Sequence, residues 1–234
     1  MRIVGLQKMT LLDYPGRVAC TVFLGGCNFR CPFCHNGGLL DGTAPELMTA
    51  AELLDFLKGR QGLLDGVCIT GGEPTLSPEL LQLLTDIKAL GFDVKLDTNG
   101  SRPKVLMQLV EAGLVDYVAM DVKNCPDRYD ATVGLPTSPL DALEESLLFL
   151  MENTVDYELR TTVVRQLHDE ASITAMGRWL YELNGRQKLP KLFLQPFVQR
   201  ASVLDQALTP PETDEMTRFV ELLDEFVESV SIRG

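Results

Sequence analysis

The stretch VACTVFLGGCNFRCPFC, residues 18–34, joins an apolar run to a loop that holds three cysteines. The run at 18–24 is typical of a buried β-strand. Cys27, Cys31 and Cys34 follow it with the spacing Cys-x-x-x-Cys-x-x-Cys, and no fourth cysteine lies near them. A closed structural metal site needs four protein ligands, whereas three thiolates can hold three irons of a [4Fe-4S] cluster. The fourth iron of such a cluster is open to a substrate or cofactor, which predicts a reactive cluster rather than a purely structural metal site.

The other three of the six cysteines are explained without a metal. Cys20 and Cys68 lie inside apolar runs, so we expect both in the core. Cys125 precedes Pro126 in a predicted loop, where we expect a free thiol. Disulfides are rare in the cytosol, so none is predicted.

Composition excludes several classes of function. The net charge is −12, from 33 acidic and 21 basic residues, which argues against a nucleic acid bound through its phosphates. No run approaches the roughly 20 apolar residues of a membrane span. The first eight residues lack the apolar core of a signal peptide. We therefore expect a cytoplasmic protein with no nucleic-acid or membrane partner, built as a single domain over residues 1–234 with a cluster loop at 25–36.

Short apolar runs alternate with amphipathic helical patterns along the chain. Six β-then-α units in succession predict an α/β fold with a parallel sheet and helices outside it. Six units are fewer than the eight of a closed TIM barrel, so we expect a three-quarter barrel, open along one side. A doubly wound open sheet is the alternative. The predicted strands are 18–24, 66–70, 92–96, 117–120, 157–164 and 192–194; the predicted helices are one capped at 49–52, then 77–90, 103–112, 138–151, 173–183 and 211–230.

Polar residues follow the predicted strands at their carboxyl ends, where parallel α/β folds bind ligands. After the cysteine loop come Gly71-Gly72-Glu73 and then Asp97-Thr98. Gly71 and Gly72 have no side chain, so a ligand can approach their backbone. Glu73 can accept hydrogen bonds from an ammonium group. Asp97 and Thr98 offer oxygens to a ribose, a cation or a backbone amide.

The fourth and fifth predicted strands add charged groups. Asp121 and Lys123 lie two residues apart on an extended segment, so they point to the same side. Lys123 can neutralise a ligand carboxylate, and Arg160, inside an apolar strand, needs an internal ion pair or a ligand. The shared position of these sets predicts one site for a ligand with an ammonium, a carboxylate and a nucleoside. S-adenosylmethionine (SAM) carries all three groups.

These residues resemble the motifs of the radical SAM superfamily. The cysteine loop with Phe33 before its last cysteine matches the cluster motif, and Gly71-Gly72-Glu73-Pro74 matches the glycine-rich motif. The flanking Asp13-Tyr-Pro-Gly16 and Cys34-His-Asn36 resemble the activases of glycyl-radical enzymes, and the match runs from about Leu6 to Gln195. The resemblance implies a partial (β/α)6 TIM barrel. It also implies reductive cleavage of SAM to methionine and a 5′-deoxyadenosyl radical, which takes hydrogen from a backbone glycine of a partner enzyme.

The resemblance also implies a role for each candidate residue. One [4Fe-4S] cluster would be held by the three cysteines, with no catalytic group beyond the cluster and SAM ligands. The glycine-rich motif would hold the methionyl amine, and a monovalent cation would lie beside the methionyl carboxylate. The implied SAM contacts are Gly71, Gly72 and Glu73 for the amine; Asp97, Thr98 and Asp121 for the cation; Lys123 and Arg160 for the carboxylate and ribose; and Phe33 and Gln195, with Phe197, for adenine.

Within the activases, the start of the chain is most similar to activating proteins of anaerobic ribonucleoside-triphosphate reductase, with pyruvate formate-lyase activating enzymes as near relatives. A flavodoxin or ferredoxin electron donor is implied. Two alternatives stay open: a radical SAM enzyme for a small molecule or peptide, and a zinc module with His35 as fourth ligand, whose adjacency to Cys34 gives poor tetrahedral geometry. His35 is expected to have a structural, partner-facing or proton-transfer role, and His168 is expected in a surface loop.

Overall fold

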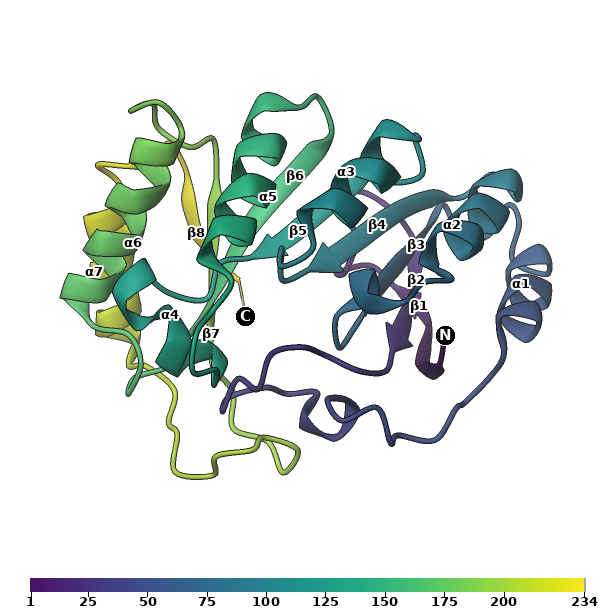
Figure 1. The fold of residues 1–234 in the computed structure, drawn as a ribbon, viewed down its shortest axis with the longest axis horizontal. Coiled ribbons are helices and arrows are strands. Elements are labelled where there is room, and N and C mark those ends of the chain that lie inside the picture. Colours follow the sequence, from purple (N-terminus) through teal and green to yellow (C-terminus); the bar gives the residue numbers. More distant parts are fainter. Residues whose placement is uncertain (234) are drawn as a thin grey trace. The chain divides into compact units, whose positions relative to one another are not determined.

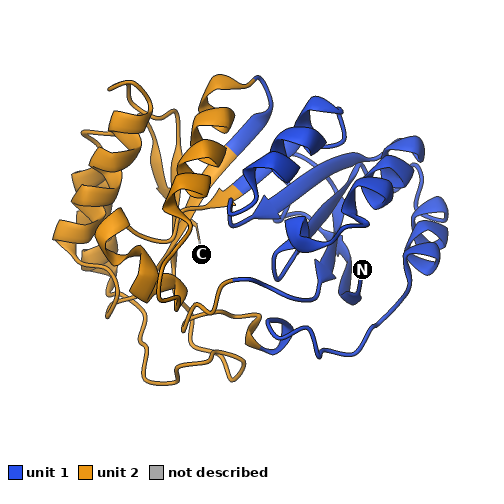
Figure 2. Ribbon diagram, viewed as in Figure 1, with its two compact units in different colours: residues 1–28, 38–119, 154–157 blue, residues 29–37, 120–153, 158–234 orange. Residues whose placement is uncertain are grey.

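The computed structural model describes residues 1–233 and divides them into two compact units (Figure 2). The first unit consists of residues 1–28, 38–119 and 154–157, and the second of residues 29–37, 120–153 and 158–233. Each unit draws on several stretches of the sequence. The prediction of a single domain over 1–234, whose last residue lies outside the described range, stays a prediction.

The first unit begins with an antiparallel pair, β1 (Ile3–Thr10) and β2 (Ala19–Leu24), joined by a turn (Figure 1). Parallel strands β3 (Gly66–Gly71) and β4 (Asp93–Thr98) follow, with Cys20 opposite Val67 and Val67 opposite Val94. The start of β5 (Tyr117–Asp121) and the first two residues of β6 (Asp156–Val163) also belong to this unit. Its helices are the 3-10 turns η1 (Gly37–Leu39, shared with the second unit) and η2 (Pro74–Leu76), and α1 (Ala50–Lys58), α2 (Leu80–Ala89) and α3 (Pro103–Glu111).

The second unit includes residues 29–37 of the cysteine loop and takes up β5 again at Met120. Val122 N donates to Arg160 O of β6 (Asp156–Val163) across 2.8 Å, and β6 continues into parallel pairing with β7 (Leu192–Pro196) and then β8 (Val230–Ile232). Its helices are α4 (Pro126–Val133), α5 (Leu140–Glu152), α6 (Glu170–Leu183) and α7 (Thr213–Leu223). Helices α6 and α7 pack closely, because Gly177 leaves room for the Leu223 and Phe226 side chains.

Strand order in the sheet follows chain order from β1 to β8. A doubly wound sheet reverses its strand order at a switch point, so that alternative is wrong. The six predicted β-then-α units are present, and the prediction of an α/β fold with a partial TIM barrel is confirmed. Among residues 1–233, no helix combines the length and the apolar character that crossing a bilayer requires.

Local signals explain most helix boundaries. Thr49 and Glu52 form the predicted capping box at the start of α1. Cys20 and Cys68 are fully buried, as predicted. Besides the 3-10 turns η1 and η2, the elements that were not predicted are β1, α4 and β8. The last helix ends at Leu223 rather than at Val230, and α2 begins at Leu80, three residues after the predicted start. Cys125 is in no disulfide and lies in the loop before α4, as predicted, where it is buried as the N-cap residue of that helix.

Candidate functional site

The cysteine loop crosses from the first unit into the second, with Cys27 in one and Cys31 and Cys34 in the other. In the second unit Cys34 N donates to Cys31 O over 3.1 Å, which closes a tight turn between the two thiols. Arg30 N donates to Val133 O at 2.8 Å. Gly134, with φ +67°, caps α4 where any Cβ would overlap Arg30 O. The end of α4 therefore holds this half of the loop.

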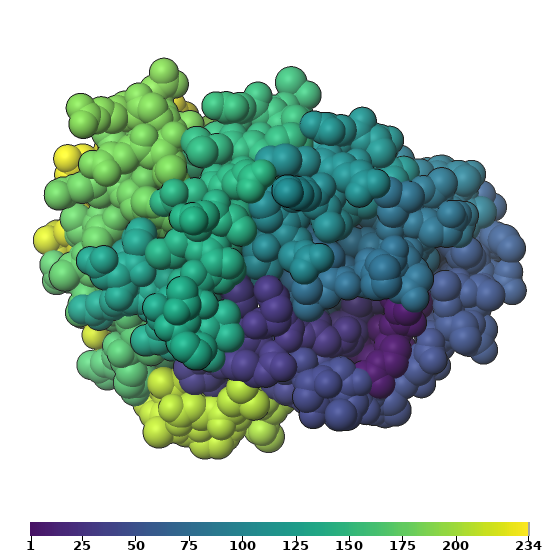
Figure 3. All heavy atoms as spheres, in the orientation of Figure 1, coloured from purple at the N-terminus to yellow at the C-terminus, as the bar shows by residue number. Residues whose placement is uncertain are grey.

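A second segment of the same unit, the β7–α7 loop at 197–209, also contacts the cysteine loop. Asp205 N donates to Pro32 O at 2.9 Å, and Ser202 Oγ donates to His35 O at 2.7 Å. His35 Nε2 donates to Val198 O at 2.7 Å, and its ring stacks on Phe197 at 5.6 Å. These contacts give exposed His35 a structural role. Most of this loop lies at the surface, in yellow-green at the bottom of Figure 3.

No disulfide joins any of the cysteines among residues 1–233. In that described range, no three His, Cys, Asp or Glu side chains gather around a single metal ion. A cubane cluster makes a different demand, because each thiolate binds a separate iron. Soft thiolates are the donors that iron–sulfur clusters take. The donor set of the loop thus fits a three-cysteine cluster.

The glycine-rich turn after β3 packs against the start of the cysteine loop within the first unit. Gly72 N donates to Leu24 O, and Glu73 N donates to Gly26 O, both at 2.8 Å. A Cβ on Gly71, which has φ +118°, would overlap Leu24, and a Cβ on Gly72 would overlap Gly26 O. These glycines therefore allow two backbone segments to meet, a requirement that comes in addition to any ligand approach.

Glu73 is only 2% exposed, and its carboxylate is fully engaged by the protein. Oε1 accepts from Thr75 N at 3.0 Å, Thr75 Oγ1 at 2.5 Å and Thr98 Oγ1 at 2.9 Å. Oε2 accepts from Asn99 N at 2.6 Å. Burial raises the pKa of Glu73 despite these donors. Four donors fill the capacity of one carboxylate, so this side chain ties the end of β4 to the end of β3.

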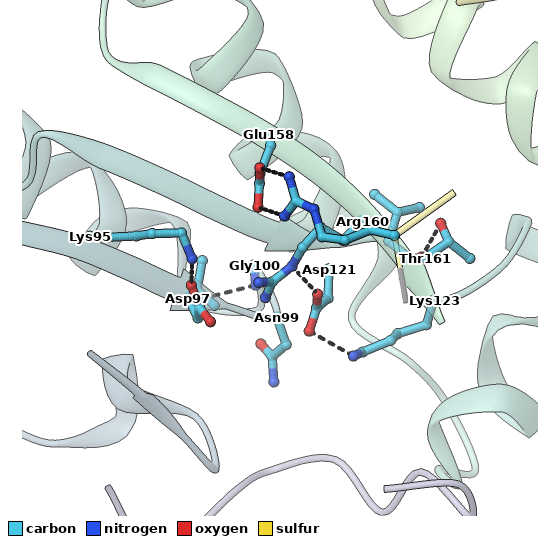
Figure 4. A network of polar contacts seen from close by, with 12 residues as sticks. Lys95, Asp97, Asn99, Gly100, Asp121, Lys123, Glu158, Arg160 and Thr161 are labelled. Carbon is cyan, nitrogen blue, oxygen red and sulfur yellow. Dashed lines mark hydrogen bonds and ion pairs between the residues drawn. The ribbon is translucent and has the colours of Figure 1, made fainter. Parts of the chain in front are cut away.

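Asp97 has a partner that the sequence reasoning missed. Lys95, only 1% exposed on β4, forms an ion pair with Asp97 Oδ1 (Figure 4). Cys68 Sγ lies 3.7 Å from the same oxygen. The signal was present in the sequence, since Lys95 is a charge two residues before Asp97 in an otherwise apolar strand. Thr98 turns its hydroxyl to Glu73 instead. Asp97 and Thr98 are adjacent in sequence, but their side chains therefore have different partners.

In the second unit the Asp121 carboxylate forms ion pairs with two cationic side chains (Figure 4). Lys123 Nζ lies 2.8 Å from its Oδ2, and Arg160 Nε lies 3.0 Å from its Oδ1. Burial favours a raised pKa for Asp121, but the two cations outweigh it and hold the pKa at about 2. Burial lowers the pKa of Lys123, while the charges of Asp121 and Cys31 outweigh burial and raise it. Two cations on one carboxylate leave an excess positive charge, which suits an anionic ligand.

Phe33 and Gln195 take separate positions in this unit. Phe33 is buried, with Lys123 Nζ 6.0 Å from its ring centroid. Gln195 of β7 pairs with Thr162 of β6, and Phe193 of β7 pairs with Arg160 of β6. Because side chains alternate along a strand, Gln195 and Arg160 lie on the same face of the β6–β7 pair.

His168 lies in a loop, as predicted, but its predicted surface position was wrong, because the residue is 3% exposed. Nδ1 accepts from Val164 N at 3.0 Å, and Nε2 donates to Lys123 O at 2.9 Å. Nδ1 also lies 3.2 Å from Val164 O, but it cannot donate there while it accepts from Val164 N at the shorter distance. These contacts favour the neutral Nε2–H tautomer. Burial lowers the pKa of His168 accordingly. This histidine anchors the backbone of Lys123.

The model of the radical SAM superfamily matches residues 21–173 of the chain, well over half its length. The chain belongs to the radical SAM superfamily. It is therefore a radical SAM enzyme, as the cysteine loop and the strand-end motifs predicted, and the family uses a [4Fe-4S] cluster and SAM.

Relatives within this superfamily differ in how much of their length the chain spans. A Methanocaldococcus jannaschii protein, provisionally named a glycyl-radical enzyme activating enzyme, is 29% identical over 99% of this chain and 95% of its own. The pyruvate formate-lyase-activating enzyme of Clostridium pasteurianum is 33% identical over 54% of each chain. A Thermococcus kodakarensis protein provisionally named a GTP 3′,8-cyclase is 34% identical over 61% of this chain and 46% of its own.

Solved structures share the radical SAM fold. Streptococcus suis SuiB bound to its precursor peptide SuiA superimposes with a TM-score of 0.71 over 92% of this chain and 48% of that one, at 12% identity. A radical SAM enzyme, anSMEcpe, with bound AdoMet gives 0.62 over 90% and 61%, at 16% identity. At such identities the likeness concerns the fold alone.

Proposed function

We propose that this radical SAM enzyme is an activase that generates a glycyl radical on a partner enzyme. The observation that carries the proposal is the relative matched over nearly the full length of both chains, which is provisionally named as such an activase. The match to the formate-lyase activase points the same way over about half of each chain. The cyclase relative is matched over less than half of its own length, which favours the activase.

The cluster in this proposal is held by Cys27, Cys31 and Cys34. When bound and reduced, the cluster would supply the electron for cleavage of SAM into methionine and a 5′-deoxyadenosyl radical. The chain's own part is to place charges around these groups. Lys123 interacts with Cys31 and with Asp121, so its ammonium offsets negative charge on the thiolate side.

For SAM, we assign the carboxylate and ribose side to Lys123 and Arg160, which share Asp121 as a common partner. Phe33 and Gln195 remain the proposed adenine contacts. The amine is assigned to the backbone of Gly71, Gly72 and Glu73 rather than to the Glu73 carboxylate. This revision follows from the four protein donors that already occupy that carboxylate.

The proposed monovalent cation also needs revision. Asp97 is already paired with the buried Lys95 ammonium, and the Thr98 hydroxyl donates to Glu73. We assign to Lys95 the positive charge that an external cation would bring to Asp97. The activity is then expected to be the same in K⁺, Na⁺ and tetramethylammonium buffers, whereas a strict requirement for one alkali ion would contradict this assignment.

The partner is tested by transfer of the radical. The protein is purified without oxygen, reconstituted with iron and sulfide, reduced with dithionite and mixed with SAM and a candidate partner. We expect a glycyl-radical signal in electron paramagnetic resonance (EPR) with an anaerobic ribonucleoside-triphosphate reductase, and a weaker one or none with pyruvate formate-lyase. A signal with the lyase alone would reassign the partner. Cleavage of SAM without a signal on any glycyl-radical enzyme would favour a small-molecule or peptide substrate.

A further inference from the structure

Asn99 lies just after β4 and reaches the first cysteine of the cluster loop within the first unit. It is 6% exposed, and its neighbour Ser101 is 8% exposed. Its backbone N–H donates to Glu73 Oε2 at 2.6 Å, so the buried carboxylate fixes the position of the Asn99 backbone. The side chain is then directed toward Cys27 and Asn28.

The orientation of the Asn99 side-chain amide can be assigned from contacts that do not involve the Cys27 sulfur. Its Oδ1 accepts from Ser101 N at 2.9 Å, and a backbone N–H can only donate, so this atom must be the oxygen. Nδ2 therefore points the other way, where it donates to Asn28 Oδ1 at 3.0 Å. Asn28 Nδ2 in turn donates to Ser101 Oγ at 2.8 Å. Asn99, Asn28 and Ser101 thus close a ring of three hydrogen bonds, one of which comes from the Ser101 backbone N–H.

The NH₂ group of Asn99 has two hydrogens, and Asn28 uses only one of them. The second is directed at the Cys27 thiol, since Nδ2 lies 4.0 Å from Cys27 Sγ. That separation is long for a hydrogen bond to a neutral thiol. A thiolate bound to iron carries more negative charge than a thiol and is a better acceptor.

We propose that Asn99 is a positioning residue for the cluster, which donates an N–H···S hydrogen bond to the Cys27 thiolate and so raises the reduction potential. The proposal rests on the assignment of Cys27 as a cluster ligand. Hydrogen bonds to the sulfurs are among the factors that set cluster potentials. A donor stabilises the reduced cluster more than the oxidised one, because the reduced cluster is more negative. Reduction by a cellular donor is easier as a result.

The test compares the reduction potentials of reconstituted variants, measured by EPR-monitored redox titration in the absence of SAM. Asn99→Ala removes the donor to sulfur, and we expect the reduced-to-oxidised ratio at a fixed potential to fall about tenfold, or about 59 mV for one electron. Asn28→Ala is the matched control. It breaks two bonds of the same ring and keeps the N–H toward Cys27, so its potential should match the wild type.

A second variant covers a failure of Asn99→Ala to fold or to hold iron. Asn99→Asp keeps the volume and the acceptor for Ser101 N, and replaces both N–H donors by an oxygen, so its potential should fall at least as far. Equal potentials in Asn99→Ala, Asn99→Asp and wild type would overturn the inference, as would an equal fall in Asn28→Ala. A wild-type protein that assembles no cluster would instead refute the assignment of Cys27, which keeps the two failures apart.

Discussion

Replacing Glu73 by Gln tests whether its carboxylate is a buried tie between strands or a ligand contact. The amide keeps the shape but has only one oxygen. With that oxygen at Oε1, the NH₂ group faces Asn99 N; with it at Oε2, the NH₂ group faces Thr75 N. Either way one buried backbone N–H loses its acceptor.

The magnitude follows from that unpaired donor. An unsatisfied buried donor costs about 1–3 kcal/mol, and a bond to a charged acceptor is worth about 1.5–3 kcal/mol. Removing the charge recovers part of this free energy, because burial disfavours the charged carboxylate and so raises the pKa of Glu73. We expect a net loss of about 2 kcal/mol, which corresponds to a fall in melting temperature of about 6 °C for a chain of this size.

The assay is urea unfolding of the metal-free protein, followed by circular dichroism, with exposed Glu145→Gln as the control variant. The SAM affinity of the reconstituted protein is measured well below the unfolding midpoint. We expect the Glu73→Gln midpoint to fall while SAM affinity changes less than about tenfold, and Glu145→Gln to leave both unchanged. Unaltered stability together with a large loss of SAM affinity would refute the reasoning and return the carboxylate to the ligand.

Three further predictions concern the second unit. Lys123→Met should weaken SAM binding about 30-fold in calorimetry, because it removes a charged contact of about 2 kcal/mol, whereas Lys88→Met, on the outside of the first unit, should bind normally. Arg233→Ala should cost about 3 kcal/mol in urea unfolding, since it removes the guanidinium that binds both oxygens of the fully buried Glu158 carboxylate, at 2.8 and 3.0 Å; a Glu158→Gln/Arg233→Ala double variant no more stable than Arg233→Ala would contradict this. His168 stays neutral when folded while the unfolded chain takes up a proton below about pH 6.5, so stability should fall by up to about 1.4 kcal/mol from pH 7.5 to 5.5. His168→Gln should lack that part of the pH dependence, and equal slopes for both proteins would argue against a neutral ring.

The fold was largely predictable because its strands are short apolar runs and most of its helices carry apolar side chains at helical spacing. The elements that were not predicted either lack these patterns or continue the pattern of a neighbouring element. Strand β1 is half exposed, with Gly5, Gln7 and Lys8 inside it, and becomes a strand only by pairing with β2. Phe226 and Val227 continue the helical spacing of α7, so the sequence did not reveal that the helix stops at Leu223.

The site was predictable in its residue types but less so in what each side chain does. The ion pairs of Asp121 with Lys123 and Arg160 follow the predicted charges. The engagement of Glu73 could not be read from sequence, because it depends on where Thr75, Thr98 and Asn99 lie once β3 and β4 pair. His168 was misplaced because a polar loop composition conceals a ring bonded to two backbone groups.

The central claim is that the three-cysteine loop holds a cluster that cleaves SAM. The direct measurement is 5′-deoxyadenosine, quantified by liquid chromatography after reduction of the reconstituted protein with SAM present. We predict that the wild type forms it and that Cys31→Ala, prepared in parallel, forms none. Wild-type protein with a full [4Fe-4S] complement and no 5′-deoxyadenosine, or equal yields from Cys31→Ala, would contradict the account.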